Sequence, residues 1–213
     1  MINAITIIKK KQGLTYEKFQ NYWKNEHAEI VTRSPLVGTY VQSHPIYNDE
    51  LTFEDTIDGI AEIWFDDTNA MRSLAATKEY EDIQNDEKVF IDGSAVRLII
   101  AEDKITVEGD ISDCKLIIFM NKSSNVELAD FRNDLVDKAS HYSKKNLNRM
   151  KVSLPKIAGY KGDKSPAWDA ILTFWLSVEV NQSYIDEVVG DFSNPAANII
   201  AKLCKSIVVQ QAS

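Results

Sequence analysis

The sequence carries the same order of predicted elements twice, and this repeat limits the choice of fold more than any other feature. The first hundred residues indicate a strand, a helix, two strands, a second helical region and a final strand. A charged stretch over 102–113, which contains one glycine, indicates a linker, and the same order then starts again. Phe19 and Phe131 are 112 positions apart, and Trp64 and Trp175 are 111 apart. This steady spacing predicts a tandem duplication; the alternative is a coincidence between two segments that mix helices and strands.

Each element of the first half has its own local signal. The run "AITII" is typical of a strand, and Thr15 is suited to cap a helix that reaches about Val31. The stretch "GTYVQSH" alternates as a strand up to Pro45, and "DGIAEIWF" predicts another strand after a polar loop over 47–56. Asp67 is suited to cap the helical stretch "TNAMRSLAAT", and "EYEDIQNDEKVFI" and "AVRLII" complete the set as a helix and a strand.

This order of elements is that of the ferredoxin-like plait, an antiparallel sheet with helices on one face. In "IAEIWF" one set of alternate residues is uniformly apolar and suits the helix side. The other set combines the carboxylate of Glu62 with the ring of Trp64 and suits a cavity wall. We therefore predict an α+β fold of two tandem ferredoxin-like βαββαβ units, over 1–105 and 112–213, whose mixed faces meet in an eight-stranded barrel.

The composition fits an ordinary globular protein. The chain has 213 residues, of which 44% are hydrophobic and 26% are charged. No apolar run approaches the roughly 20 residues that a transmembrane helix needs. The N-terminal "INAITIIKKK" has its apolar residues before its lysines, which is the reverse of a secretory signal. We therefore expect a cytoplasmic protein with no membrane partner.

The charge and the cysteines exclude several other classes of protein. A formal net charge of −8 argues against a nucleic-acid partner, because proteins that bind phosphate backbones carry basic patches. Residues 1–110 hold 11 Lys and Arg against 21 Asp and Glu, whereas residues 111–213 hold 13 against 11, which indicates two separate units. Cys114 and Cys204 have no zinc-type or redox-type spacing, so we expect both to be buried apolar residues.

Polar side chains that share one side of a predicted strand are the first candidates for a site. Tyr40, Gln42 and His44 alternate along "YVQSH" and therefore project to the same side. Burying these three polar side chains against an apolar helix layer without hydrogen-bond partners would cost free energy, so we expect them on the cavity side. The alternative is a polar outward face on an edge strand. For His27, the spacing alone favours a solvated histidine near a helix C-terminus, where the dipole stabilises a protonated ring by ~0.3–1 kcal/mol.

Four segments resemble the EthD-like family of the dimeric α+β barrel superfamily. They are "LTYEKFQNYWKNEHAEIV", with its His-Ala pair, "YVQSHPI", with its Tyr-x-Gln-x-His pattern, "DGIAEIWFDD" and "EKVFID". Together they span about the first hundred residues, and the second half is similar to the family only in outline. His27 aligns with Ala139 in the second half, and its counterpart of "TYVQSH" has no histidine. The chain therefore resembles a tandem fusion with a degenerate second copy.

The resemblance implies a fold and a substrate class more firmly than a reaction. Members of the family dimerise to complete the barrel, so a fused pair resembles an intramolecular dimeric-type α+β barrel, a pseudodimer within one chain. A homodimer of whole chains is left open. Relatives include a gene product linked to ether degradation, lactone isomerases, and fungal dehydratases or decarboxylases. The family implies a small hydrophobic substrate and neither a metal nor an organic cofactor.

The match to the family's His-Ala position makes His27 a candidate general acid or base, because an imidazole that titrates near neutrality can move protons. Tyr40 and His44 would then orient or polarise an oxygen of the substrate. For Tyr22, Trp23 and Trp64, the alternative role is packing in the core. Glu62 could instead bond a tyrosine of the cavity. Glu26 is either a pocket group or turned to water. The predicted catalytic residues are His27, His44 and Tyr40, and the predicted substrate-binding residues are Trp64, Glu62, Gln42, Trp23 and Tyr22.

Together with these residues, the resemblance implies a cofactor-independent enzyme that performs isomerase, dehydratase or decarboxylase chemistry on a hydrophobic carbonyl or aromatic compound. No metal site is predicted, because the chain has three scattered histidines and no HExxH motif. The alternatives are a cofactor-free oxidoreductase or monooxygenase, and a protein that binds a small molecule without chemistry. A third alternative is a barrel filled by its own side chains that acts only through its surface.

Overall fold

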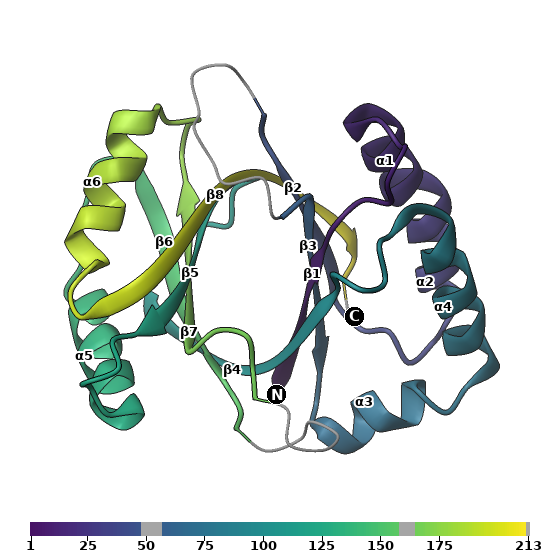
Figure 1. The fold of residues 1–213 in the computed structure, drawn as a ribbon, viewed down its shortest axis with the longest axis horizontal. Helices are drawn as coiled ribbons and strands as arrows, with labels where there is room; N and C mark the ends of the chain where they lie inside the picture. The colour runs from purple at the N-terminus through teal and green to yellow at the C-terminus, as the bar shows by residue number, and fades with distance from the viewer. Residues whose placement is uncertain (48–56, 158–164, 212–213) are drawn as a thin grey trace. The chain divides into compact units, whose positions relative to one another are not determined.

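The computed structural model describes residues 1–47, 57–157 and 165–211 (Figure 1). Its strands form one closed barrel in the order β1-β3-β2-β8-β5-β7-β6-β4. The strands are β1 (Ile2–Ile8), β2 (Tyr40–Pro45), β3 (Gly59–Phe65), β4 (Arg97–Val107), β5 (Cys114–Lys122), β6 (Leu147–Pro155), β7 (Ala170–Leu176) and β8 (Ala196–Gln210). The helices are α1 (Tyr16–Tyr22), the π-helix η1 (Trp23–His27), α2 (Ala28–Thr32), α3 (Thr68–Leu74), α4 (Lys78–Phe90), α5 (Leu128–Ser140) and α6 (Gln182–Phe192).

This topology corrects the predicted fold class. The sequence predicted two tandem ferredoxin-like units that press together as a pseudodimer, whereas the strands form a single closed barrel. The prediction was wrong because it made two strands too short. β4 has 11 residues and continues beyond the predicted "AVRLII", and β8 has 15 residues and begins at Ala196, before the predicted "KSIVVQQ". Residues 102–107, predicted as part of a linker, belong to β4. The tandem duplication itself stays a prediction.

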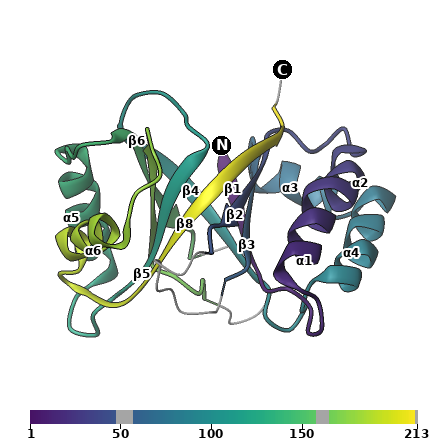
Figure 2. The ribbon, with the colours of Figure 1, turned by 90° about the horizontal axis from the view of Figure 1, so that it is seen from above.

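The chain divides into two compact units. Unit 1 comprises Met1–His44, Asp55–Ile100 and Ile207–Ser213, and unit 2 comprises Pro45–Glu54 and Ala101–Ser206. In unit 1, helices α1, α2 and α4 cover one face of the strands β1 and β3, as two views of the ribbon show (Figures 1 and 2). In unit 2, α5 and α6 cover one face of β5, β6 and β7 (Figures 1 and 2).

In unit 1, β3 pairs in antiparallel fashion with both β1 and β2. Ile63 stands opposite Ala4 on one side and Tyr40 on the other, so these three side chains share a face of the sheet. All three belong to the core that packs against Phe19 and Phe90 of the helices. The apolar set of "IAEIWF" therefore faces the helices, as the alternation predicted.

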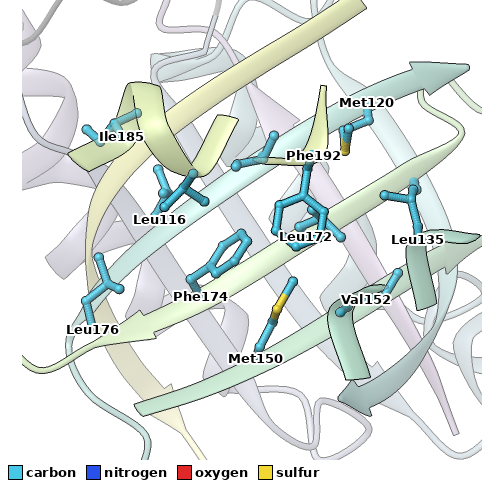
Figure 3. Close-up of a cluster of buried hydrophobic side chains, with 14 of the residues drawn as sticks. Leu116, Met120, Leu135, Met150, Val152, Leu172, Phe174, Leu176, Ile185 and Phe192 are labelled. Carbon is cyan, nitrogen blue, oxygen red and sulfur yellow. The ribbon is translucent and has the colours of Figure 1, made fainter. Parts of the chain in front are cut away.

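In unit 2, β5 lies between β7 and β8. Figure 3 shows how side chains of β5, β6 and β7 converge with those of α5 and α6 in a buried apolar cluster, for example Leu116, Met150, Phe174, Ile185 and Phe192. Burying apolar surface of this kind is the main stabilising term of a domain core.

The opposite face of the unit 2 sheet has a different character. Lys115, which pairs with Trp175 across the strands and lies over its ring, is 2% exposed. This face therefore combines buried charge with aromatic surface, in contrast to the apolar cluster on the helix side.

The predicted helix starts are confirmed. Thr15 accepts a hydrogen bond from the backbone N–H of Lys18 at 3.3 Å, and Asp67 accepts bonds from Asn69 and Ala70. Such side-chain acceptors satisfy N–H groups that a first helical turn leaves unpaired.

Other predictions on the chain also have outcomes in the structure. Both cysteines are buried, as expected, and they are not joined in a disulfide. Of the polar loop predicted over 47–56, only Tyr47 lies within the described residues. Among the helices that the structure describes, none is long and apolar enough to span a membrane.

Candidate functional site

The predicted site residues lie on both faces of the unit 1 sheet. Across the β2–β3 ladder, Gln42 stands opposite Ala61 of the helix-covered face, whereas Val41 stands opposite Glu62. Tyr40, Gln42 and His44 therefore project toward the helices, and Glu62 and Trp64 project to the other face. The expectation that all of them share one cavity wall is wrong. The strand "YVQSH" can face the helix layer because the helices supply polar partners.

Tyr40 and Gln42 form a buried hydrogen-bond network with Trp23. Tyr40 is 1% exposed, and its hydroxyl oxygen accepts a bond from the indole N–H of Trp23 at 3.3 Å and from the Gln42 amide at 2.9 Å. The Gln42 amide also donates to the backbone carbonyl of Trp23 at 2.8 Å. Burial raises the pKa of Tyr40 to about 12. The phenol is therefore neutral near pH 7 and has a proton to donate.

His44 continues this network from the edge of the same strand. Its Nε2 lies 3.0 Å from the amide oxygen of Gln42, and its Nδ1 contacts the amide oxygen of Gln20. The ring packs against Trp23, with 4.5 Å between the ring centroids. Burial, with a smaller effect of the charge of Lys24, lowers the pKa of His44 to about 4. A neutral imidazole donates from only one nitrogen, so it bonds one of the two amide oxygens at a time.

Trp23 and His27 begin and end a π-helical turn between α1 and α2. Both side chains are buried, whereas Lys24, Asn25 and Glu26 between them are exposed. Single π-helical turns inside α-helices are rare and occur frequently at functional sites. Glu26, for which the sequence left two roles open, is thus turned to water.

His27 and Tyr22 share the carboxylate of Asp86 from α4. The Nδ1 of His27 lies 2.7 Å from Asp86 Oδ2, and the Tyr22 hydroxyl donates to Asp86 Oδ1 at 2.5 Å. His27 is 4% exposed, and its ring packs against Phe90 with 4.8 Å between the centroids. With Nδ1 on the carboxylate, Nε2 has no hydrogen-bond partner among the residues that the structure describes. An imidazole held in this way presents Nε2 as a base.

Burial decides the protonation of His27. It lowers the pKa of the ring, and this effect exceeds the opposing effect of the bond to Asp86. His27 is therefore neutral near pH 7. The pKa of Tyr22 is raised to about 12, first because its hydroxyl donates to Asp86 and then because of burial. Tyr22 and His27 are thus both neutral hydrogen-bond donors to the Asp86 carboxylate.

A groove of about 800 Å3 runs beside α4 and is lined by residues that include Lys11, Glu87, Ile91 and Val96. Burial and the neighbouring Asp86 raise the pKa of Glu87 to about 7. The charge of Glu87 also acts on Tyr40 and Tyr80. Glu87 therefore couples the groove electrostatically to the Tyr40 network.

Asp86 and Glu87 were not among the predicted residues, although the sequence contains a signal for them. Ile83 and Phe90 of α4 are buried and seven positions apart, so a helix places residues 86 and 87 on the same face. Two acids on the apolar face of a helix are costly unless they are bonded or functional. The pattern "IQNDEKVF" was therefore enough to nominate both carboxyl groups.

The remaining candidates lie apart from these networks. The amide of Asn3 donates to Glu62 at 3.2 Å, and Trp64 is partly buried on the same face. His141, at the end of α5 in unit 2, is exposed and bonds the backbone carbonyl of Asp137. In the part of the chain that the structure describes, no group of three or more His, Cys, Asp or Glu is arranged to hold a metal ion. The predicted roles of the site residues stay predictions.

The family model of the EthD domain matches residues 11–94 of the chain. This range contains the His27, Tyr22 and Asp86 cluster and the Tyr40 network, and it confirms the family resemblance inferred from the sequence.

Solved structures with the same fold match nearly the whole chain, including the part beyond the EthD domain. A candidate monooxygenase from Lactobacillus acidophilus NCFM is 12% identical, with 99% of this chain and 96% of that chain covered and a TM-score of 0.58. An anthrone oxidase-like protein is 9% identical, with coverage of 100% and 94% and a TM-score of 0.63. A chlorite dismutase variant from Candidatus Nitrospira defluvii is 9% identical, with coverage of 98% and 91% and a TM-score of 0.54. No curated protein sequence matches the chain.

Proposed function

We propose that the protein is an enzyme that moves a proton on a small hydrophobic carbonyl or aromatic compound, with His27 as the general base. The observation that carries this proposal is the arrangement of His27, Asp86 and Tyr22 around one carboxylate. The EthD domain supports it, because the cluster lies within that domain. Isomerisation, dehydration and decarboxylation all use such proton transfers.

In the proposed reaction, Nε2 of neutral His27 removes a proton from a carbon next to the substrate carbonyl. The imidazolium that forms is stabilised by the Asp86 carboxylate, which lies 2.7 Å from Nδ1. Asp86 also fixes the ring tautomer, because Nδ1 must donate to the carboxylate. A buried ion pair of this kind forms only after proton transfer, so it lowers the barrier rather than the energy of the free enzyme.

Tyr40 is the proposed partner of the substrate oxygen. Its hydroxyl oxygen already accepts two hydrogen bonds, from Trp23 and Gln42. Its own proton has no acceptor among the residues that the structure describes, although the side chain is 1% exposed. A hydroxyl polarised by two donors is a stronger donor itself, and an enolate oxygen would be a suitable acceptor.

The proposal is tested by proton exchange, which requires no knowledge of the full reaction. The protein is incubated in D2O with a panel of carbonyl compounds that includes anthrone and a small lactone, and NMR measures the loss of each signal next to the carbonyl. We expect His27→Ala to slow the exchange by ~10²–10⁴-fold, the usual contribution of one general base. Asp86→Asn should slow it less, because Nε2 is still present.

The matched control is His141→Ala, since this exposed histidine of unit 2 should not affect the exchange rate. Exchange that continues unchanged in a folded His27→Ala variant would exclude His27 as the base. Ligand binding without any exchange would instead favour a protein that binds a small molecule without chemistry.

A second candidate function is cofactor-free oxidation of an activated aromatic compound. The structural neighbours named as a candidate monooxygenase and an anthrone oxidase-like protein favour it. The same proton transfer would begin this reaction, because a carbanion reacts with oxygen more readily than its parent compound. Oxygen consumption that depends on His27, measured with anthrone, would separate this function from simple proton transfer.

A further inference from the structure

The groove beside α4 lies near the His27 cluster, and the proposed chemistry does not use it. Two of its lining residues, Glu87 and Ile91, directly follow Asp86 and Phe90 in the chain. Asp86 bonds His27, and Phe90 packs against its ring. The groove and the His27 cluster are therefore built on adjacent positions of the same helix.

The size of the groove suits a small molecule, and two side chains of its lining offer apolar surface. Its volume of about 800 Å3 is within the range of pockets that hold small ligands. Ile91, which is 5% exposed, and the partly buried Val96 supply apolar surface. The remaining lining is mainly polar, so a ligand that filled the groove would also need a polar end.

The two cations of the groove are already engaged. The ammonium group of Lys11 donates to the backbone carbonyl of Lys88 at 2.6 Å, and that of Lys88 donates to Asn85 at 2.8 Å. Among the lining acids, Asp92 accepts two bonds from Ser94, and Glu81 lies 3.8 Å from Lys78. These bonds to neutral oxygens do not remove the charge of either lysine, so the lining holds two cations against the three acids Glu81, Glu87 and Asp92.

Glu87 differs from the other lining acids. Its carboxyl makes neither a hydrogen bond nor an ion pair within the described residues, although it is partly buried. A partly buried carboxylate that lacks a donor is stabilised by any ligand that supplies one. A second carboxylate brought to the same place would be repelled.

We propose that the groove binds a flat apolar compound whose polar end is a hydrogen-bond donor, a hydroxyl or an ammonium group, and that Glu87 receives this donor and excludes carboxylates. If the bound compound is the substrate, this inference rests on the proposed function and names its substrate class. The binding of the compound is a separate property and can be measured without turnover.

Three matched fluorescent probes test the proposal: naphthol, naphthylmethylamine and naphthoate. They share one apolar body and differ in the polar end. Titration of the full chain at pH 8, above the pKa of Glu87 of about 7, should show tighter binding of naphthol and naphthylmethylamine than of naphthoate. Glu87→Gln should weaken the binding of naphthylmethylamine roughly tenfold or more, the usual effect of losing a bond to a charged group. The same substitution should leave naphthoate unchanged or bound more tightly.

The matched control is Asp82→Asn. Asp82 is an exposed acid on the same helix that pairs with Lys78 and does not line the groove. It should leave all three affinities unchanged. Equal affinity for naphthoate and naphthol, or an equal effect of Asp82→Asn and Glu87→Gln, would overturn the proposal. Failure of the proton-exchange test together with selective binding here would remove the proposed chemistry and keep the binding site.

Discussion

Tyr22 and His27 share the carboxylate of Asp86. The bond to this carboxylate raises the pKa of each group, but burial acts in the same direction only at Tyr22. For Tyr22, the bond to Asp86 and burial both raise the pKa, so the phenol stays protonated. For His27, the bond to Asp86 raises the pKa but burial lowers it more, so the ring stays neutral. The result is a pair of neutral donors on one carboxylate, in which only the histidine has a second nitrogen available for a reaction.

Trp23 is held in place by a close approach that only glycine permits. The side chain is fully buried and donates to Tyr40, and a Cβ added at Gly59 of β3 would lie 2.5 Å from its Cζ3 atom. Since the indole is fixed on its other sides, we expect Gly59→Ala to lower the free energy of unfolding by about 1–3 kcal/mol, the usual cost of overpacking a core. Urea unfolding measures this loss.

Gly93→Ala provides the control for Gly59→Ala, because nothing lies within 4 Å of a Cβ at that position. It should change the stability little. If the two alanine variants lost equal stability, the contact between Gly59 and Trp23 would not be the cause.

At the scale of elements, the sequence predicted the first helical segment but not its π-helical turn. Thr15 and the aromatic spacing were enough to place a helix up to about residue 31, and the structure continues it through α2 to Thr32. A π-helical turn leaves no mark in apolar periodicity over five residues, because it changes the period only locally. The pattern of α4 was enough to nominate Asp86, but the sequence could not show that His27 would be its partner, since that contact joins residues 59 positions apart.

The π-helical turn sets the direction of His27 relative to Trp23. Deletion of the exposed Asn25 should convert η1 to a regular α-helix and change the angle and the rise between Trp23 and His27. Because Trp23 is held by Tyr40, we expect His27 to turn away from Asp86. The NMR signal of the Nδ1 proton bonded to the carboxylate should disappear, with a loss of roughly 1.5–3 kcal/mol of stability.

Asn25→Ala is the control for this deletion, because it removes the bonds of the side chain to Asn21 but keeps the helical register. It should retain the Nδ1 signal. A persistent Nδ1 signal in the deletion variant would show that the π-helical turn does not orient His27.

At the scale of the whole molecule, the order of elements and an eight-stranded barrel were predictable, and the full length of the strands was not. Alternation along "DGIAEIWF" and the N-caps give the elements, because these signals depend on near neighbours. The extension of β4 to Val107 depends on its pairing with β6, for instance of Asp103 with Ser153. Partners so distant in sequence turn a charged stretch that looks like a linker into a strand.

The stability of the whole chain should depend on pH through two partly buried groups, His44 and Glu87, whose effects have opposite signs. Burial lowers the pKa of His44 from 6.5 to about 4, so the unfolded chain binds more protons than the folded chain between these pH values. The contribution of His44 to stability is therefore complete above pH 6.5 and is lost as the pH falls toward 4. Burial and Asp86 raise the pKa of Glu87 from 4.5 to about 7, so the folded chain binds more protons and stability is lost as pH rises through this window. At about 1.36 kcal/mol per unit, each effect reaches up to about 3 kcal/mol, and the two largely cancel between pH 4.5 and 6.5.

Substitution of either group should reveal the effect of the other on the pH dependence of stability. Relative to the natural chain, Glu87→Gln should make stability rise more steeply with pH between about 4.5 and 6.5, and His44→Asn should make it fall more steeply, as measured by urea unfolding at a series of pH values. His27, whose pKa is also lowered by burial, adds to the effect of His44 in the first variant. Asp82→Asn, on an exposed acid, should reproduce the natural profile. If both test variants also kept that profile, neither group would titrate differently in the folded and unfolded chains, and the buried electrostatics of unit 1 would have to be assigned to other residues.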